Sequence, residues 1–376
     1  MTALSHDAWV AVSRAALRHN VQAVRTLLAQ GTDRPPQMIA VVKANAFGHG
    51  AGETARIMQE AGVGFFAVTT PVEAWELRAA GITGRILVFL PPLPDQADAL
   101  VEAEVDISVG DEEGLRQTAH AARRQGKTAR VHLKVDTGMG RLGILPADAL
   151  PLARRIAAEP VVEFAGLYTH FARALEKDPT PTRRQFAQFQ QVARQIEEAG
   201  IHPGLRHCAN SAAMVRFPEM RLDAVRPGTA LYGQYPSAAV PRTLDLQDTW
   251  RLQARVVAVR DVPAGTAVGY GGEYVTRRPT RLAVLPIGYA DGFTVAPASV
   301  TSGWRGVRTL LRDLTGRGPG VSVTLHDRRA PVLGRVAMQV CTADVTDIPG
   351  VAVGDIATVP ARRITASARL PRIYED

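Results

Sequence analysis

The stretch Ala40-Val41-Val42-Lys43-Ala44-Asn45-Ala46-Phe47-Gly48-His49-Gly50 places a lysine between an apolar run and a glycine-containing turn. The apolar run starts at Met38, and a helical pattern follows the turn. This order predicts a buried strand that delivers the amine of Lys43 to the rim of a sheet. A lysine in such a position is costly unless it is paired or used in chemistry.

Lysine is rare in this chain, which makes Lys43 more informative. Lysine and arginine together number 44, but only four of these residues are lysines. A desolvated amine can lose its proton and form a Schiff base with a carbonyl, whereas a guanidinium cannot. Lys43 is therefore a candidate catalytic residue.

Short apolar runs alternate with amphipathic helical patterns through the first part of the chain. Eight such units within about 220 residues favour a closed (β/α)8 TIM barrel over an open doubly wound sheet. The open sheet would be expected to carry a glycine-rich dinucleotide turn after its first strand, which this sequence lacks. The predicted strands are Met38–Val42, Gly64–Val68, Arg85–Phe89, Val105–Val109, Ala129–Val135, Glu163–Tyr168, Leu205–Ala209 and Leu222–Val225.

The character of the sequence changes after about residue 236. Short alternating segments separated by Pro and Gly predict a smaller, mostly β domain. We expect the barrel to span residues 10–236 and the β domain residues 237–376, where residues 1–9 can also pack. Thr301–Gly320 has the pattern of an insertion with its own helical turn.

Composition indicates a globular protein of the cytoplasm. The chain is 46% hydrophobic and 21% charged, and it has no apolar run long enough to cross a membrane. Met1–Trp9 does not resemble a signal peptide, and the two cysteines fit a reducing compartment. The net charge of +8 comes mainly from scattered arginines, which favour a solvated surface over nucleic-acid binding.

Polar and charged residues follow the ends of several predicted strands. In a (β/α)8 barrel these ends meet on one face, where active sites are built. We therefore expect the residues to lie close together. They are Lys43, Arg141, His170, His207, Asn210, Ser211, Arg226, Gly228 and Thr229.

Each of these residues also has an ordinary structural explanation. A single histidine such as His170 is more often a hydrogen-bonded core residue, and Ser211 can simply cap a helix. Arg141 can pair with Asp136. Lys134 is harder to dismiss, because a buried amine needs an anion, and Asp136 points to the same strand face.

The set as a whole is typical of a pyridoxal phosphate site. Backbone N–H groups at helix starts bind anions, so the turn after Lys43 and the segment at Ser211 suit a phosphate. A lysine, a phosphate cradle and an arginine on a barrel rim together describe this cofactor's requirements.

At these residues the chain resembles the alanine racemases, which are fold-type III pyridoxal phosphate enzymes. Val41-Val42-Lys43-Ala44-Asn45-Ala46 followed by an aromatic residue and Gly-His-Gly is highly specific, and the similarity covers nearly the whole chain in order. The matching stretches are Ala40–Gly50, Lys134–Gly143, Gly166–Ala172, His207–Ala213, Val225–Gly233, Val268–Tyr274, Pro286–Gly292 and Gly334–Met338.

The resemblance implies a two-base mechanism in a homodimer. Lys43 matches the cofactor-bound lysine and one acid/base, and Tyr270 matches the second acid/base, supplied by the partner subunit. A tyrosine pKa is normally about 10, so it needs activation, for which the family uses the histidine matched by His170. The expected partners are a small amino acid and a second copy of the chain.

The resemblance also implies roles for other residues. Arg226 matches the partner of the cofactor's pyridine nitrogen, where an arginine discourages ring protonation and side reactions such as transamination. Lys134 matches a lysine that is often carbamylated and positions the arginine matched by Arg141. The implied cofactor-binding residues are Lys43, Arg141, His170, Asn210, Ser211, Arg226, Gly228 and Thr229. The implied substrate-binding residues are Arg141, Tyr289 and Met338, and no metal is expected.

The sequence departs from the family pattern at three positions. Phe47 stands where the family usually has a tyrosine whose hydroxyl helps to hold the phosphate. Ala368 stands where the family usually has a tyrosine that lies at both the phosphate and the entrance. Gln339 replaces an aspartate. These changes predict weaker cofactor retention and a wider entrance that admits serine or larger amino acids.

The leading hypothesis is an isomerase that interconverts L- and D-alanine for peptidoglycan synthesis. One alternative is a broad-specificity or pathway-dedicated amino-acid racemase. Another is a non-catalytic homologue that binds pyridoxal phosphate, which the presence of both Lys43 and Tyr270 disfavours.

Overall fold

A computed structural model describes residues 6–295 and 321–376, which form two compact units. The first unit is Arg14–Thr249, and the second joins the described residues up to Ser13 with those from Trp250 onward. The insertion expected at Thr301–Gly320 lies outside the described residues.

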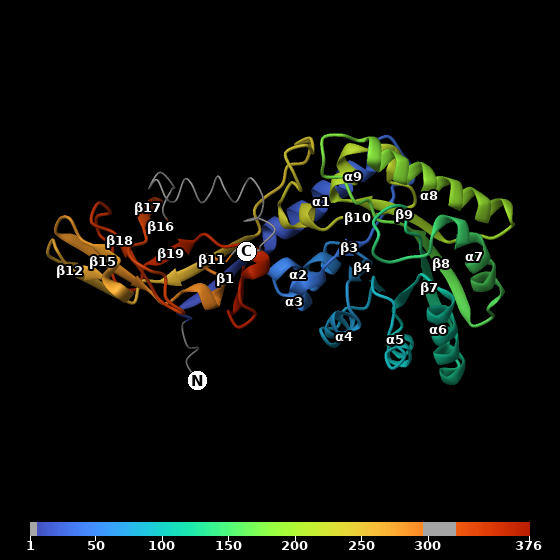
Figure 1. Ribbon diagram of the computed structural model, residues 1–376, viewed down its shortest axis with the longest axis horizontal. Helices are drawn as coiled ribbons and strands as arrows, with labels where there is room; N and C mark the ends of the chain where they lie inside the picture. Colours follow the sequence, from blue (N-terminus) through green and yellow to red (C-terminus); the bar gives the residue numbers. More distant parts are fainter. Residues whose placement is uncertain (1–5, 296–320) are drawn as a thin grey trace. The chain divides into compact units, whose positions relative to one another are not determined.

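The first unit is a barrel of parallel strands with helices around it (Figure 1). Every neighbouring pair in this sheet is parallel. The strands are β2 (Gln37–Met38), β3 (Ala40–Val41), β4 (Phe65–Val68), β5 (Arg85–Val88), β6 (Asp106–Val109), β7 (Ala129–Lys134), β8 (Val162–Tyr168), β9 (Leu205–Asn210) and β10 (Ala224–Arg226).

The barrel closes through its first strand, which is divided at Ile39 into β2 and β3. β2 pairs with β10, whereas β3 pairs with β4. The N–H groups of Ile39 and Val41 donate to β10 and the residue after it, and the N–H of Val42 donates to β4. Counting β2 and β3 as one strand leaves the eight expected strands, so the predicted (β/α)8 barrel is confirmed.

The helices between the strands begin and end at recognisable signals. Thr70 caps α4 (Pro71–Ala79) in a capping box with Glu73, and Pro71 occupies the first turn. Asp111 caps α6 (Glu112–Gln125), which ends at a left-handed Gly126. The other helices of the barrel unit include α1 (Arg14–Ala29), α3 (Ala51–Glu60), α5 (Ala97–Glu102), α7 (Ala149–Ala158), α8 (Thr180–Glu198) and α9 (Ser211–Arg216). No helix in the described ranges is long and apolar enough to span a membrane.

The second unit is mostly β. Its main sheet has the order β17-β16-β19-β11-β1-β20, so the N-terminal strand β1 lies between β11 and β20. A smaller sheet contains β12 (Ala258–Val262), β15 (Thr280–Leu285) and β18 (Cys341–Asp344), and β13 (Ala267–Val268) pairs with β14 (Tyr274–Val275). The main strands are β1 (Ala8–Ser13), β11 (Trp250–Arg255), β16 (Ser322–Leu325), β17 (Arg328–Pro331), β19 (Ile356–Val359) and β20 (Arg372–Glu375).

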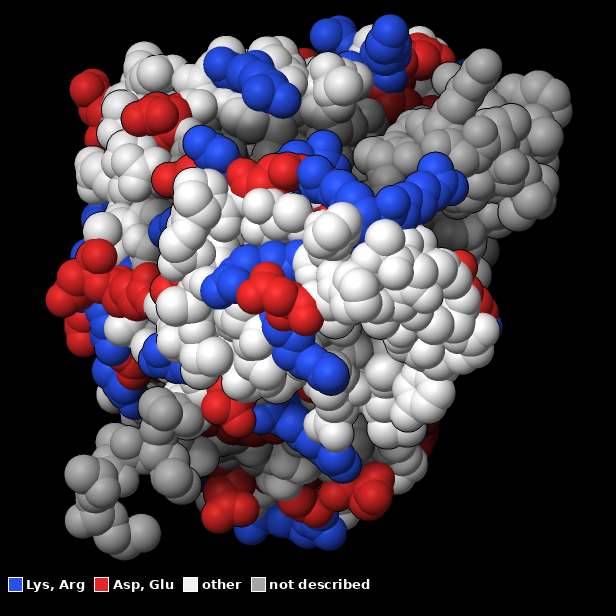
Figure 2. All heavy atoms as spheres, turned by 90° about the vertical axis from the view of Figure 1, so that its left-hand side faces the viewer, with Lys and Arg blue, Asp and Glu red and all other residues white. Residues whose placement is uncertain are grey.

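Basic and acidic side chains are interspersed over the face drawn in Figure 2. Within the β unit, Arg278 pairs with Asp347 and Arg281 pairs with Asp261. Part of the unit's positive charge is therefore balanced locally by carboxylates.

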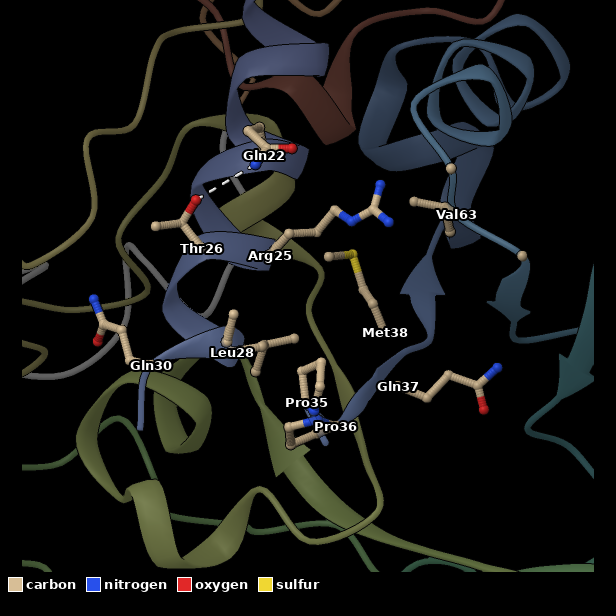
Figure 3. Close-up of a pocket in the computed structure, with 13 residues that line it drawn as sticks. Gln22, Arg25, Thr26, Leu28, Gln30, Pro35, Pro36, Gln37, Met38 and Val63 are labelled. Atoms are coloured by element: carbon tan, nitrogen blue, oxygen red, sulfur yellow. Dashed lines mark hydrogen bonds between the residues drawn. The ribbon is translucent and has the colours of Figure 1, made fainter. Parts of the chain in front are cut away.

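A cavity of about 710 Å³ lies at the amino-terminal end of the barrel strands, beside α1 and the segment Pro35–Met38 (Figure 3). Its one charged lining residue is Arg25, whose Nη1 donates to the Ala61 carbonyl at 2.6 Å. The described lining of this cavity offers no second ionisable side chain that could act together with Arg25.

Arg78 on α4 holds together two loops at the amino-terminal end of the strands. Its guanidinium donates to four backbone carbonyls at 2.7–3.2 Å. The acceptors belong to Ile82, Gly84, Ala103 and Glu104.

We expect Arg78→Leu to lower the free energy of unfolding by about 2–3 kcal/mol, because several carbonyls lose a charged donor at once. Urea unfolding monitored by circular dichroism measures the change. Arg116→Leu is the matched control, since Arg116 pairs only with nearby residues on an exposed helix face and should matter little. Equal effects of the two substitutions would contradict the proposed bracing by Arg78.

Candidate active site

A pocket of about 290 Å³ lies at the carboxyl ends of the barrel strands. The barrel brings together seven of the residues predicted from sequence in its wall. They are Lys43, His170, Asn210, Ser211, Arg226, Gly228 and Thr229. Lys134 and Arg141 are not part of this wall, but both lie close enough to lower the pKa of His170.

The turn after Lys43 has an unusual backbone. Ala44 to Phe47 all adopt left-handed conformations, with φ between 52° and 54°. Each non-glycine residue in this region costs roughly 1–2 kcal/mol. Such strain persists only where the surroundings fix it, and it is common at functional sites. The segment α2 (Lys43–Gly48) is therefore a left-handed turn rather than an ordinary right-handed helix.

Glu73 fixes this turn to the adjacent strand and helix. Its Oε1 accepts from the Ala44 N–H at 2.6 Å, and its Oε2 accepts from the N–H groups of Thr69 and Thr70. One carboxylate thus joins the end of β4, the start of α4 and the residue after Lys43. We did not predict Glu73 as a site residue, although the capping box Thr70-x-x-Glu73 is visible in the sequence.

The amine of Lys43 is prepared to act as a base. Burial lowers its pKa, and the positive charge of Arg141 lowers it further, while Glu73 opposes the shift. A lysine with a lowered pKa is more often neutral near physiological pH, so it can accept a proton or attack a carbonyl.

The expected pairing of Lys134 with Asp136 is present only as a charge interaction: Asp136 opposes the lowering of the Lys134 pKa, but no ion pair joins the two side chains within the described ranges. Asp136 instead accepts four backbone N–H groups of the following loop, from Gly138 to Arg141. Lys134 lies in the barrel interior with its Nζ 5.4 Å from the centre of the Tyr168 ring. Burial, followed by the charges of Arg226 and Arg141, lowers the Lys134 pKa to about 8.

His170 and Arg226 meet in the wall of the pocket. Arg226 is buried, and its Nη2 lies 3.4 Å from His170 Nδ1 and donates to the Thr169 carbonyl at 2.6 Å. Burial and the neighbouring Arg226 lower the pKa of His170 to about 3. His170 is therefore neutral and can accept a hydrogen bond at physiological pH.

Ser211 and Gly228 form a small polar cradle in the same wall. Ser211 Oγ accepts from the Gly228 N–H at 2.9 Å, which leaves its hydroxyl hydrogen available to a ligand. A Cβ on Gly228 would press against the ring of Phe47, which would have to shift slightly to admit it. Asn210 faces its own helix instead, because its Oδ1 caps α9 through Ala212 and Ala213.

The chemistry of this donor set fits pyridoxal phosphate. Lys43 and Arg226 line the pocket, Lys134 and Arg141 lie near it, and their charges depress the pKa values of neighbouring basic groups. Such a concentration of cations favours an anionic ligand. The lowered pKa of Lys43 suits an aldehyde carbon, and the Ser211–Gly228 cradle suits a phosphate.

The remaining predicted residues belong to the β unit. Tyr270 lies on a glycine-rich turn, Gly269–Gly272, and is 71% exposed. It shares the wall of a cavity of about 510 Å³ with Met338. The Tyr289 N–H donates to the Ala337 carbonyl at 3.1 Å, which places Tyr289 beside Met338 in this unit.

The three departures from the family pattern differ in their surroundings. Phe47 is partly buried, lines the pocket and packs against Tyr232 with ring centres 4.8 Å apart. Gln339 and Ala368 are exposed on the β unit. Only Phe47 therefore has a direct structural connection to the cradle within the barrel.

Comparison with known protein families assigns both units. Residues 12–236 match the alanine racemase N-terminal domain, and residues 249–370 match the alanine racemase C-terminal domain. The alanine racemase of Methanococcus maripaludis is 37% identical over 99% of both chains. That of Desulforamulus reducens is 41% identical over 92% of this chain and 88% of its own.

Solved structures give the same result. The alanine racemase of a D-cycloserine-producing Streptomyces lavendulae has a TM-score of 0.83 at 34% identity, covering 99% of this chain and 98% of its own. The alanine racemase of Clostridium difficile 630 has a TM-score of 0.88 at 26% identity, covering 99% and 96%.

The lowered pKa of Lys134 predicts a pH-dependent contribution to stability. Between about pH 8 and about pH 10.4, the unfolded chain keeps a proton on Lys134 that the folded chain has lost. Because the unfolded state binds more protons there, stability rises with pH through this window. We expect the wild type to gain stability relative to Lys134→Met between these limits.

Urea unfolding of both proteins in carbon dioxide-free buffer measures this difference and keeps Lys134 as an unmodified amine. Groups distant from Lys134 titrate alike in both proteins, so their contributions cancel, and the difference reports Lys134 together with the groups coupled to its charge. A stability difference that stays constant from pH 7 to pH 10.4 would contradict the lowered pKa.

Proposed function

The chain belongs to the alanine racemase family, and on this premise we propose that it is a pyridoxal phosphate-dependent isomerase that interconverts L- and D-alanine. The observation that carries the proposal is the coincidence of a family match over both units with Lys43 at the mouth of a cationic barrel pocket. The matched C-terminal unit contains Tyr270, the second proposed acid/base.

When bound, pyridoxal 5′-phosphate supplies an electron-withdrawing ring that acidifies the α-hydrogen of the attached amino acid. Lys43 would hold the cofactor covalently, and Ser211, Gly228 and Thr229 would hold its phosphate. Arg226, which is buried and fixed by several acceptors, would face the ring nitrogen. A permanent cation at that position disfavours a second positive charge on the ring.

Racemisation needs two acid/base groups on opposite faces of the substrate. The lowered pKa of Lys43 supports its role as the group on one face. We assign the other face to the hydroxyl of Tyr270, with His170 as the neutral acceptor that assists it. A group on the far face must come from outside the barrel rim.

We further propose that the enzyme is a homodimer in which each subunit lends Tyr270 to the other. Tyr270, Tyr289 and Met338 are large side chains that remain 48–71% exposed in the single chain. Exposed apolar side chains of this size are typical of contact surfaces. The proposed Tyr270 exchange would bury this group against a symmetry-related subunit.

The substrate carboxylate would meet Arg141, an exposed cation near the pocket, together with Tyr289 and the Met338 backbone. Lys134 would position Arg141; an uncharged or carbamylated Lys134 would remove the repulsion between the two cations. The lowered pKa of Lys134, about 8, supports this role, because a neutral amine is the form that reacts with carbon dioxide.

We place the enzyme in the cytoplasm, as a source of D-alanine for peptidoglycan. Both cysteines are free and buried, in keeping with a reducing compartment. A broader amino-acid racemase is the second candidate function, favoured by Ala368, whose small exposed side chain stands where the family has an entrance tyrosine.

With added cofactor, the wild type is expected to racemise L-alanine. Lys43→Ala and Tyr270→Phe should each lower kcat by at least about 100-fold, because each removes a proton-transfer group. Chiral chromatography measures D-alanine formation, and α-proton exchange in deuterated water separates the two faces. Full activity in either variant would refute the two-base assignment.

The same assays with L-serine and L-lysine distinguish the two candidate functions. Comparable kcat/KM values for all three amino acids would favour the broad racemase, and Ala368→Tyr should then restore selectivity. A strict preference for alanine that Ala368→Tyr leaves unchanged would exclude a widened entrance. Cofactor binding without α-proton exchange from any of them would instead identify a binding protein.

Phe47→Tyr is expected to tighten cofactor binding. A hydroxyl in the cradle beside Gly228 adds roughly one hydrogen bond to the phosphate, or about 0.5–1.5 kcal/mol. The dissociation constant of pyridoxal phosphate should therefore fall by about 2- to 12-fold. Fluorescence titration of the cofactor-free protein measures it, and Phe89→Tyr, at another position in the pocket wall, is the control. An unchanged constant for Phe47→Tyr would contradict a role for position 47 in holding phosphate.

A further inference from the structure

A continuous row of hydrogen-bonded side chains runs through the barrel interior to Arg226. Arg226 Nη1 lies 2.7 Å from His207 Nδ1, and His207 Nε2 lies 3.0 Å from His132 Nδ1. His132 Nε2 lies 2.9 Å from Asp106 Oδ2. All four residues are buried, and Asp106, His132 and His207 have no exposed surface. We call this row the Asp106–Arg226 relay.

The chemistry of Arg226 and Asp106, at the two ends of the relay, fixes which ring nitrogen of each histidine carries the hydrogen. A guanidinium only donates, so His207 must accept at Nδ1 and carry its hydrogen on Nε2. His132 must then accept at Nδ1 and carry its hydrogen on Nε2, which donates to the carboxylate of Asp106. Both histidines are neutral, and burial lowers the pKa of each.

The charges at the two ends are arranged differently. Asp106 forms ion pairs with Arg85 and Arg130. Burial alone would raise the pKa of Asp106, but its hydrogen bond to His132 and the charge of Arg85 outweigh burial and lower that pKa. Among the described residues, Arg226 has no carboxylate within ion-pairing distance, and its acceptors are carbonyls and histidine nitrogens. Asp106 is therefore the anion to which Arg226 is connected, through the two rings.

The neighbouring strands leave room for the relay. Gly166 on β8 lies opposite His132, and a Cβ at this position would overlap His132 Nδ1. The ring of Tyr168 stacks on His207, with an angle of 4° between the planes and 4.9 Å between centres. Tyr168 is itself held by a 2.7 Å hydrogen bond to Ser108. A glycine and an aromatic ring thus fix the positions of the two histidines.

We propose that Asp106 and His132 are positioning residues that lock the orientation of Arg226 from the opposite end of the barrel interior. The inference rests on the proposed function, in which Arg226 faces the cofactor ring. The negative charge of Asp106 sets one tautomer in both histidines, so that His207 always offers a lone pair to Arg226. Without that charge, the relay can reverse, and His207 then presents an N–H toward the N–H of Arg226.

Asp106→Asn is the direct test, because it keeps the shape and removes the charge. The amide lacks the charge that holds both histidines in one tautomer, and its NH2 group can donate to His132 Nε2, so the reversed relay becomes accessible. We expect kcat for alanine to fall by about 10- to 100-fold, as for other outer residues that orient a functional group, with little change in KM. A displaced Arg226 would no longer disfavour protonation of the ring nitrogen, so transamination, which leaves the amino group and electron pair on the cofactor and releases pyruvate, should rise by about tenfold or more per racemisation event.

Gly166→Ala tests the same relay without changing any titratable residue. The added methyl displaces His132 and should reproduce both effects. Thr118→Val is the matched control, since Thr118 is equally buried but donates to the Gly114 carbonyl within α6. Asp106→Asn and Gly166→Ala with kcat and pyruvate ratio both within about twofold of the control would overturn the proposal.

Nitrogen-15 NMR of the imidazole rings in the cofactor-free wild type gives a readout that is independent of activity and of variant folding. His132→Gln and His207→Gln assign the signals. The relay requires Nε2–H in both rings, and Nδ1–H or a charged ring in either one would refute it. If the wild type shows these tautomers but racemises no amino acid, the proposed function fails while the relay geometry stands.

Discussion

The backbone hydrogen bonds that join β2 to β10 and β3 to β4 close the barrel, and the pocket depends on them. The divided first strand pairs with β10 through β2 and with β4 through β3, so the sheet closes and the carboxyl ends of all its strands meet around one opening. Lys43 follows β3 and Arg226 ends β10, at the place where this closure brings the two ends of the sheet together. Residues far apart in sequence, such as His170 and Lys43, consequently line one pocket. An open sheet made from the same strands would separate β3 from β10.

The barrel interior accommodates several cations close to the pocket, and their mutual repulsion has to be offset. An anionic ligand needs several cations nearby, but cations crowded together in a low dielectric repel one another. Here the cost falls on Lys43 and Lys134, whose pKa values are lowered, while Arg226 keeps its charge by donating to carbonyls and a histidine. Under the proposed function each adjustment would also serve chemistry, because a lysine with a lowered pKa is a better base and a fixed arginine can orient a ligand.

Periodicity and motif spacing were sufficient to predict the barrel and seven of the nine residues expected together at its mouth, whereas Arg141 lies outside the pocket wall and His207 lies in the barrel interior. Each apolar run from Met38 to Val225 corresponds to a strand, because parallel strands buried on both faces leave a strong signal. The left-handed turn was not predictable, since Ala44 to Phe47 contains no glycine and its conformation depends on Glu73. The expected Lys134–Asp136 pair is reduced to a charge interaction, because four backbone N–H groups compete for the carboxylate. His132 carries a weak signal, as a polar residue two positions from Lys134 on the same buried face, but its partner Asp106 is identified only by the fold.

The place of β1 in the sheet of the β unit bears on the order in which the chain can fold. β1 lies between β11 and β20, which follow it only after the whole barrel has been synthesised. During translation, the first strand must therefore wait with both edges unpaired while residues 14–249 emerge and fold behind it. An unpaired apolar strand such as Ala8–Ser13 is a site for aggregation until β11 has been synthesised and can pair with it. The β unit is thus a long-range assembly that can be completed only after the barrel residues have been synthesised.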